Sequence, residues 1–353
     1  MLFSINAQAT EVTISARCAY VYIPEAQIAV YEKNATVRRP MASTTKIMTA
    51  LVAMEALPLD TVITIPSEAV GIEGTSAYLK EGDEYTLENL LYAVLLQSAN
   101  DAAAAVAIGV GESIEGFAEM MNEKAKSLGL LNTHFTNPHG LDDKEHYTTA
   151  KDLALLTAYA LDNEDFKAIV STYKKTITTT DKQQSQTIVN HNKMLLLYKG
   201  ANGVKTGFTK KSGRCLVSSA ERDGMTVIAV TLDAPSDWQD HSTLLDSAFS
   251  AYERRIYAEA EQIKHGISVM NGDKQTLLCY NKNELSYIAK KDDAYATLVV
   301  EMDKIAVAPI EKGDVVGYVY CKINGQEITS SPIIASEKIN KIKTKKGIWG
   351  LLR

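Results

Sequence analysis

The sequence predicts an α+β domain over residues 11–260, an antiparallel sheet with a cluster of helices, followed by a small all-β domain over residues 261–336. Two observations predict this fold class. Strand-like and helical segments are grouped along the chain, whereas parallel α/β proteins alternate them. After about Ile263 the helical periodicity disappears and short alternating segments follow. A length of 353 residues is ordinary for two domains.

The first part of the α+β domain begins with strands and continues with helices. Strands are predicted at 12–14, 18–23 and 28–31, with a turn near Pro24. From Ser43 to Glu55 the apolar residues recur with a period of about 3.6, which predicts a helix that ends before Pro58. Further helices are predicted at 87–96, 102–110, 117–127 and 151–161.

The second part of this domain is mostly strand. Residues 166–204 favour strand and polar loop, and strands are predicted at 203–208, 214–220 and 226–232. The turn residues Asp223-Gly224 join the last two strands into a hairpin. A helix at 242–259 is expected to close the domain. The β-sandwich-like domain that follows has predicted strands at 267–270, 276–280, 296–301, 305–307, 315–323, 327–330 and 333–335.

Composition excludes several classes of protein. Hydrophobic residues make up 46% and charged residues 23% of the chain, so it is not broadly disordered. Lys and Arg total 37 against 43 Asp and Glu, and a net charge of −6 argues against nucleic-acid binding. No run of 18 or more apolar residues predicts a membrane-spanning helix.

Cysteine and histidine spacing gives no sign of a metal or cofactor site. The cysteines at 18, 215, 279 and 321 form no C-x-x-C pair, and Cys279 with Cys321 is the one disulfide considered. No H-E-x-x-H pattern surrounds His139 and His146, which we interpret as loop and surface residues.

The two ends lie outside both predicted domains. Residues 1–10 contain Ala7-Gln8-Ala9, which fits either a signal-peptide remnant or a chance match at a frayed end. Residues 337–353 interleave five lysines with isoleucine ahead of Trp349. This composition indicates either a basic amphipathic segment at an anionic membrane surface or a solvated basic tail.

Three short motifs carry residues suited to catalysis. Ser43-Thr44-Thr45-Lys46 begins the first strong helix, where residues i and i+3 share a face and a lysine amine can accept a serine proton. Ser98-Ala99-Asn100 lies at a predicted helix–helix corner, and Lys205-Thr206-Gly207 lies on a predicted strand. Each motif alone is weak, because Ser171-Thr172-Tyr173-Lys174 also fits S-x-x-K and Ser4-Ile5-Asn6 also fits S-x-N.

The order and spacing of the motifs are more specific. Ser98 follows Ser43 by 55 residues, and Lys205 follows Ser98 by 107. This order is the signature of penicillin-recognising active-site-serine enzymes. Over roughly residues 12–255 the chain resembles the low-molecular-mass penicillin-binding proteins that are D-alanyl-D-alanine carboxypeptidases. Further similar stretches lie at 31–34, 38–46, 96–102, 137–141, 147–150, 190–193 and 205–209.

The resemblance implies a fold and a set of roles. The fold is the transpeptidase domain shared by penicillin-binding proteins and β-lactamases. Ser43 attacks the D-Ala-D-Ala bond, forming an acyl-enzyme, and Lys46 is the general base. Ser98 relays protons, and Asn100 holds the substrate amide. The implied substrate-binding residues are Asn100, Lys205, Thr206, Gly207, Phe208 and Thr209, with the backbone N–H groups of Ser43 and Phe208 as the oxyanion hole.

The resemblance also implies partners and a location. The expected partners are peptidoglycan stem peptides ending in D-Ala-D-Ala and β-lactams as covalent inhibitors, with no metal, cofactor or nucleic acid. The expected location is outside the cytoplasm, secreted across the bacterial cytoplasmic membrane and associated with its outer face. A signal-peptide remnant and a membrane-surface tail are therefore the favoured interpretations of the two ends.

One departure from the family concerns an arginine that follows K-T-G and contacts the substrate carboxylate. The corresponding stretch here, residues 233–240, contains no Arg or Lys, so the alternatives are that Thr206, Thr209 or Lys210 takes its place or that the carboxylate contact is weaker.

Three alternatives remain open beside the carboxypeptidase. They are a D,D-endopeptidase, a β-lactamase that would need a deacylating carboxylate such as Glu145 or Glu164, and a catalytically weak penicillin-binding scaffold.

Overall fold

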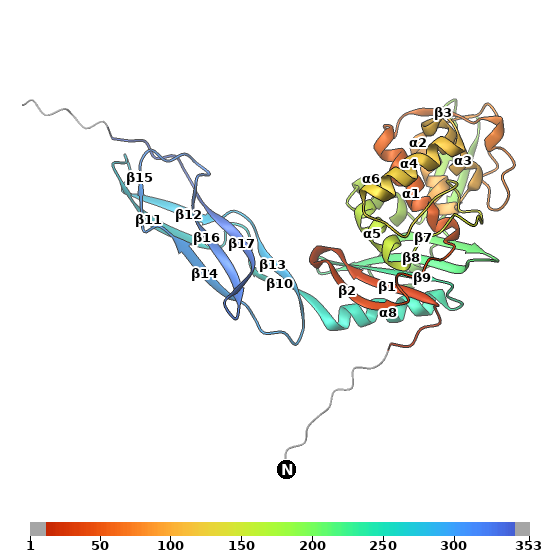
Figure 1. Cartoon of the computed structure of the whole chain (residues 1–353). Helices are drawn as coiled ribbons and strands as arrows, with labels where there is room; N and C mark the ends of the chain where they lie inside the picture. The colour runs from red at the N-terminus through yellow and green to blue at the C-terminus, as the bar shows by residue number, and fades with distance from the viewer. Residues whose placement is uncertain (1–11, 343–353) are drawn as a thin grey trace, which may run out of the picture. The chain divides into compact units, whose positions relative to one another are not determined.

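The computed structural model describes residues 12–342, which form two compact units divided between Ala251 and Tyr252 (Figure 1). We expected the division between residues 260 and 261. It lies earlier because strand β10 (Tyr252–Ala258) pairs with β13 (Leu285–Lys290), so these residues belong to the second unit. Our predictions for residues 1–10, and for the tail beyond residue 342, lie outside the described residues.

A five-stranded antiparallel sheet forms the base of the first unit, with the strand order β2-β1-β9-β8-β7 (Figure 1). Strand β1 is buried along its whole length and pairs with both β2 and β9, so the beginning and the end of the unit meet in this sheet. Strand β7 is at the edge. The strands are β1 (Cys18–Ile23), β2 (Ile28–Lys33), β7 (Ala201–Thr209), β8 (Gly213–Arg222) and β9 (Met225–Leu232).

Helices cover both faces of this sheet. Helix α8 (Asp237–Ala251) packs on one face, and a cluster of helices lies on the other (Figure 1). At the centre of the cluster is α3 (Asn100–Gly111), whose first eight residues are all buried. The other helical elements are η1 (Pro24–Ala26), η2 (Ala42–Thr45), α1 (Lys46–Ala56), η3 (Ser67–Ala69), α2 (Leu87–Tyr92), η4 (Ala93–Gln97), α4 (Ile114–Ser127), α5 (Ala150–Leu161), α6 (Glu164–Ser171) and α7 (Met194–Leu197).

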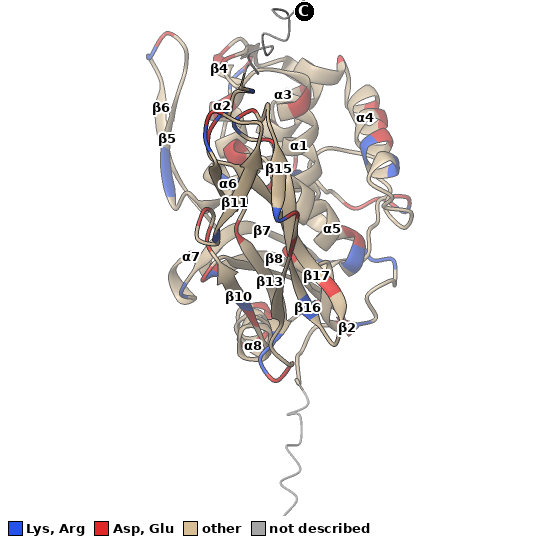
Figure 2. Ribbon diagram, turned by 90° about the vertical axis from the view of Figure 1, so that its left-hand side faces the viewer, with Lys and Arg blue, Asp and Glu red and all other residues tan. Residues whose placement is uncertain are grey.

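Two short hairpins complete the first unit. Strands β3 (Val62–Thr64) and β4 (Glu84–Thr86) form one, and β5 (Lys174–Thr178) and β6 (Ser185–Val189) form the other. Figure 2 shows the β5–β6 hairpin extending beside the helices, with cationic and anionic residues interspersed along the ribbon. The mixed charge agrees with the near balance of charges in the sequence.

Three predictions for the first unit were wrong. The helix predicted at 242–259 begins earlier and ends at Ala251, because the residues after it pair with a strand that the sequence analysis did not identify. Within 166–204 we expected strand and loop, but α6 occupies the beginning. Asn163 caps α6 by accepting from the backbone N–H groups of Asp165 and Phe166. Residues 12–14 are not a strand.

The second unit is all-β, as predicted. Its six-stranded sheet has the order β14-β16-β17-β12-β11-β15, and β10 with β13 forms a two-stranded sheet. The buried core includes Leu277, Val319 and Ile333. The two predicted strands at 327–330 and 333–335 form one continuous strand. The strands of the larger sheet are β11 (Lys264–Met270), β12 (Thr276–Asn281), β14 (Thr297–Met302), β15 (Ile305–Val307), β16 (Val315–Ile323) and β17 (Gln326–Ala335).

The cysteines and the start of the C-terminal tail also lie in these cores. All four cysteines are buried free thiols, so the Cys279–Cys321 disulfide is not formed. Ile339 is buried in the β-domain and bridges Ile310, while Lys341 bridges Gly272. The β-domain therefore continues beyond residue 336. No helix within residues 12–342 is long and apolar enough to cross a membrane.

Candidate active site

Ser43 lies on a tight turn between the sheet and the first long helix. The turn is η2, and Lys46 opens α1 directly after it. Ala42 has the left-handed backbone angle φ 48°, which is uncommon for a residue with a side chain. The hydroxyls of Thr44 and Thr45 donate to the carbonyls of Met41 and Ala42 at 2.7 and 2.8 Å, which stabilises the turn.

Lys46 is fully buried beside this serine. Its Nζ lies 3.1 Å from Ser43 Oγ, 2.7 Å from Asn100 Oδ1 and 2.6 Å from the carbonyl oxygen of His139. Burial lowers the pKa of Lys46 well below its usual value, and the charge of Lys205 lowers it further, while the charge of Asp101 raises it. A neutral amine has two N–H groups and one lone pair. When these two N–H groups donate to Asn100 Oδ1 and to the carbonyl of His139, the lone pair can accept the proton of the Ser43 hydroxyl.

The S-x-N motif forms a corner between η4 and α3. Ser98 has the left-handed angle φ 65° and lines the same cleft as Ser43. The Asn100 side chain is used on both sides: Oδ1 accepts from Lys46, and Nδ2 donates to the carbonyl of Glu73 at 2.5 Å. Asn100 does not line the cleft. The Asn100 side chain therefore contacts Lys46 and orients its amine.

Strand β7 passes very close to the nucleophile turn. A Cβ at Gly207 would lie 3.0 Å from the backbone nitrogen of Ser43 and 3.1 Å from that of Thr44. The missing side chain therefore allows the sheet edge to approach the turn. We expected Gly207 to make room for a ligand, and the structure shows that it first makes room for Ser43.

Lys205, a residue of this strand, is buried, with 1% of its surface exposed. Its Nζ donates to the carbonyl of Thr206 at 2.9 Å. Burial lowers the pKa of Lys205 to about 7. The site thus contains two buried lysines, Lys46 and Lys205, and burial favours the neutral form of each.

A cleft of about 700 Å³ opens along the edge of β7. The structure brings Ser43, Ser98, Thr206, Gly207 and Phe208 together in its wall. Thr209 does not line it, because its hydroxyl donates to Asp142 at 3.0 Å. The remaining lining residues come mainly from segments without a predicted role and are Thr75, Tyr173, Val189, Asn190, His191, Lys193, Leu196, Leu197, Arg214, Asp237 and Trp238.

The segment 137–146 contributes contacts that motif reasoning missed. His139 and His146 are buried, so our interpretation of them as surface residues was wrong. Burial lowers the pKa of His139 to about 3 and that of His146 to about 4, so both rings are neutral. His146 Nδ1 accepts from the Thr136 N–H at 3.0 Å, and Nε2 lies 2.7 Å from Thr45 Oγ1, which links this segment to the nucleophile turn.

Gly140 allows the same segment to contact the turn. Its φ is +89°, and a Cβ there would lie 2.0 Å from the carbonyl oxygen of Ala42. No side chain fits. The run Asn137-Pro138-His139-Gly140-Leu141 in the sequence was a signal for this contact, but only the fold shows which atoms it supplies.

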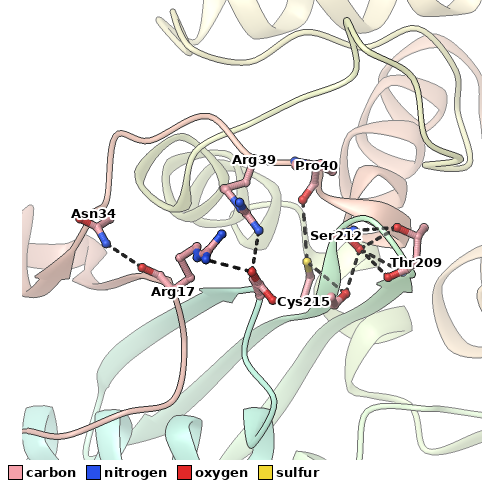
Figure 3. Close-up of polar contacts among 9 residues, drawn as sticks. Arg17, Asn34, Arg39, Pro40, Thr209, Ser212 and Cys215 are labelled. Carbon is pink, nitrogen blue, oxygen red and sulfur yellow. Dashed lines mark hydrogen bonds and ion pairs between the residues drawn. The ribbon is translucent and has the colours of Figure 1, made fainter.

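The chain leading to the nucleophile contacts Asp233, which follows β9, and Cys215 on β8. Arg39 Nη2 lies 2.6 Å and Arg17 Nε lies 3.7 Å from Asp233 Oδ2. Figure 3 shows the side chains of Arg39 and Arg17 pointing toward the same place. The Cys215 thiol lies 3.9 Å from the carbonyl oxygen of Pro40. These contacts hold residues 39 and 40 in place and so determine where the η2 turn begins.

The stretch 233–240 contains no cation, and the structure shows what it supplies to the cleft. Asp237 and Trp238 line the wall, and Arg214 from β8 lies against them. Neither Thr209 nor Lys210 lines the cleft. Sequence reasoning missed Arg214 because it searched the chain after β9, whereas this arginine lies on the neighbouring strand. Within residues 12–342, no three or more His, Cys, Asp or Glu side chains are grouped to bind a metal ion.

Comparison with known proteins identifies relatives of both units. Residues 5–236 match the model of the D-alanyl-D-alanine carboxypeptidase family, and residues 252–341 match the C-terminal domain of penicillin-binding protein 5. The chain is similar to D-alanyl-D-alanine carboxypeptidase DacF of Bacillus subtilis, 33% identical over 337 residues, which cover 90% of this chain and 86% of the relative.

Two solved structures illustrate the similarity. Penicillin-binding protein 5 of Haemophilus influenzae has a TM-score of 0.69 and 26% identity, covering 95% of this chain and 100% of its own. The DD-transpeptidase of Streptomyces K15 has a TM-score of 0.65 and 34% identity, covering 68% of this chain and 99% of its own. The first similarity covers both units, whereas the second covers about two thirds of this chain.

Proposed function

The chain belongs to the D-alanyl-D-alanine carboxypeptidase family, and we propose that it removes the terminal D-alanine from peptidoglycan stem pentapeptides through an acyl-enzyme on Ser43. The observation that carries the proposal is the buried amine of Lys46, 3.1 Å from Ser43 Oγ. A serine hydroxyl is a weak nucleophile and needs an adjacent base. A desolvated lysine held by two carbonyl-type oxygens is such a base.

Acylation begins when Ser43 Oγ attacks the carbonyl carbon of the penultimate D-alanine. Lys46 takes the hydroxyl proton, and the backbone N–H groups of Ser43 and Phe208 stabilise the negative charge on the carbonyl oxygen. The proximity of Gly207 to Ser43 supports this pairing, since it brings the β7 backbone next to the turn. The C–N bond then breaks. The proton from Lys46, relayed by Ser98, goes to the nitrogen of the leaving D-alanine.

Deacylation uses a water molecule in place of the amine. Lys46 is neutral again after acylation and can take a proton from that water, which attacks the ester carbon. The C–O bond to Ser43 breaks, and Oγ regains its proton. In this scheme Asn100 orients the amine of Lys46 through its Oδ1 contact at 2.7 Å. A β-lactam acylates Ser43 by the same first step.

Two of the alternatives fit the cleft less well. A β-lactamase needs a carboxylate that activates water, but neither Glu145 nor Glu164 lines the cleft. Among the described lining residues Asp237 is the only carboxylate, and it forms an ion pair with Arg214. A scaffold without activity would not need a buried base in contact with a serine. An endopeptidase has the same chemistry and differs only in the leaving group.

The test of the activity is D-alanine release from a soluble peptide ending in D-Ala-D-Ala. We expect release by the wild type and none by Ser43→Ala, with penicillin labelling lost in the same variant. Ser171→Ala is the matched control, because Ser171 belongs to the second S-x-x-K sequence and its hydroxyl only donates to the carbonyl of Ala168. Equal release by Ser43→Ala would contradict the proposal.

We further propose that the enzyme acts outside the cytoplasm and that the segment beyond residue 342 associates with the outer face of an anionic membrane. Peptidoglycan stem peptides are located on that side. The last described residue, Ile342, is exposed and donates its N–H to the carbonyl of Asn271 at 2.8 Å. Beside it Met270 pairs with Val307, and both are exposed apolar residues. These exposed apolar residues lie next to the basic segment, so they support the proposed contact with a membrane surface.

Binding to vesicles tests this location. We expect the full chain to co-sediment with vesicles containing anionic lipid and a chain that stops after Ile342 to bind less, with binding weakened by salt. Equal binding by both chains would contradict a role for the segment beyond Ile342.

A further inference from the structure

The substrate ends in a carboxylate, so the cleft needs a cation that can contact it. Lys193 and Arg214 are the cationic residues among the described lining residues. Lys205 is buried and donates to a backbone carbonyl. A guanidinium binds a carboxylate through two parallel N–H bonds, which an ammonium cannot do. Arg214 is therefore the stronger candidate on chemistry.

Arg214 also lies on the appropriate face of the sheet. It is the register partner of Phe208 on β7, and directly opposed residues of antiparallel strands share a face. Thr206 lies two residues from Phe208, so its side chain is on that face as well. The cleft is lined by Thr206, Phe208 and Arg214 together with Ser43. The arginine thus borders the cleft next to strand β7.

Asp237 holds the guanidinium in position. Arg214 Nε and Nη2 each lie 2.9 Å from Asp237 Oδ2. The side chain of Asp237 is only 5% exposed, while that of Arg214 is 43% exposed. The ring of Trp238 lies 5.8 Å from the guanidinium carbon. Because the contacts to Asp237 use one edge of the guanidinium, the edge with Nη1 remains for a second carboxylate.

We propose that Arg214 binds the terminal carboxylate of the substrate and that Asp237 is its positioning residue. This inference rests on the proposed carboxypeptidase function and deepens it. In this arrangement Asp237, from the stretch 233–240, orients Arg214 from strand β8. The stretch itself therefore does not have to contain the cation that binds the carboxylate. Thr206, on the same face, lies next to the carboxylate position.

The test compares two peptides that differ only in this carboxylate: one ends in D-Ala-D-Ala and the other in D-Ala-D-alaninamide. We expect Arg214→Gln to lower kcat/KM for the acid by about 10- to 100-fold, the range of a lost charge-assisted contact. For the amide kcat/KM should stay within about twofold. Because both peptides are assayed on one preparation, loss of folded protein cancels in the acid-to-amide ratio.

Two further variants separate binding from structural support. Lys193→Gln is the matched control and should leave the acid-to-amide ratio unchanged. Asp237→Asn should lower the ratio partly, mainly through KM, because Arg214 keeps its charge but loses its orientation. Arg214→Lys should recover part of the ratio lost in Arg214→Gln.

The outcomes distinguish this inference from the proposed function. An unchanged ratio in Arg214→Gln, or a collapse of the ratio in Lys193→Gln alone, would overturn the assignment while leaving the carboxypeptidase intact. Failure of the wild type to cleave either peptide, together with no penicillin labelling of Ser43, would instead overturn the proposed function.

Discussion

Lys46 Nζ and Ser43 Oγ lie 3.1 Å apart. The other polar contacts of this amine are with the amide oxygen of Asn100 and the backbone carbonyl of His139. No carboxylate within residues 12–342 contacts this amine, so none of the described residues compensates directly for the burial of its charge. The second buried lysine, Lys205, adds repulsion. The protein therefore favours the neutral, basic form of Lys46 by withholding a counter-ion, and this arrangement makes several predictions.

The first prediction concerns the pH dependence of acylation. Lys46 must be neutral to accept the serine proton, so the rate of acylation by penicillin should rise with pH along an acid limb set by its lowered pKa. In Lys205→Gln one positive charge is absent, so the pKa of Lys46 should rise and the acid limb should move to higher pH. The measurement is the acylation rate constant from pH 5 to pH 10. A limb that moved to lower pH would disprove the coupling.

The second prediction concerns stability. Burial lowers the pKa of Lys205 to about 7 in the folded protein, so between this value and the unfolded value near 10.5 the unfolded chain binds more protons. Stability therefore rises as pH increases through this range, and the buried lysine destabilises the protein at neutral pH. Lys205→Met should raise Tm at pH 7, where even 1 kcal/mol corresponds to about 2–4 °C. The gain should shrink toward pH 10, as scanning calorimetry at both pH values would show.

The third prediction compares two glycines with similar backbone angles. Gly140 and Gly82 have φ of +89° and +81°, but only Gly140 has a neighbour within reach of a Cβ, the carbonyl oxygen of Ala42 at 2.0 Å. Gly82→Ala should cost about 1–3 kcal/mol of unfolding free energy from backbone strain and leave acylation unchanged. Gly140→Ala should cost more and also abolish penicillin labelling. Labelling that survived in Gly140→Ala would show that the turn tolerates displacement.

The fourth prediction concerns Asn100, whose amide links Lys46 to the carbonyl of Glu73. Asn100→Asp places a carboxylate beside the amine, which should raise the pKa of Lys46 and move the acid limb of acylation to higher pH. Asn100→Ala removes the acceptor without adding charge, so it should slow acylation by about 10-fold or more with a smaller shift of the limb. Stopped-flow acylation of both variants separates charge from orientation. Identical pH profiles would argue that Asn100 does not act through Lys46.

Much of the fold was predictable because it depends on local patterns. The alternation and turn residues of β8 and β9 predicted their hairpin, and the 3.6-residue period predicted α1 within a few residues. Strand β10 was not predictable in this way. Its pairing with β13 is a contact between segments far apart in sequence, and neither segment has a period that excludes helix.

The sequence by itself determined which residue types carry the chemistry, because Ser43, Lys46, Ser98 and Lys205 are side chains in recognisable motifs. The tertiary structure decided what surrounds them. Lys46 contacts the backbone carbonyl of His139, and because every residue has such a carbonyl, the sequence does not indicate which one lies in the site. Arg214 reaches the cleft because β8 lies beside β7, so its position depends on strand register rather than on distance along the chain. Burial, which lowers the pKa of both lysines and so favours their neutral forms, is likewise a property of the packed molecule alone.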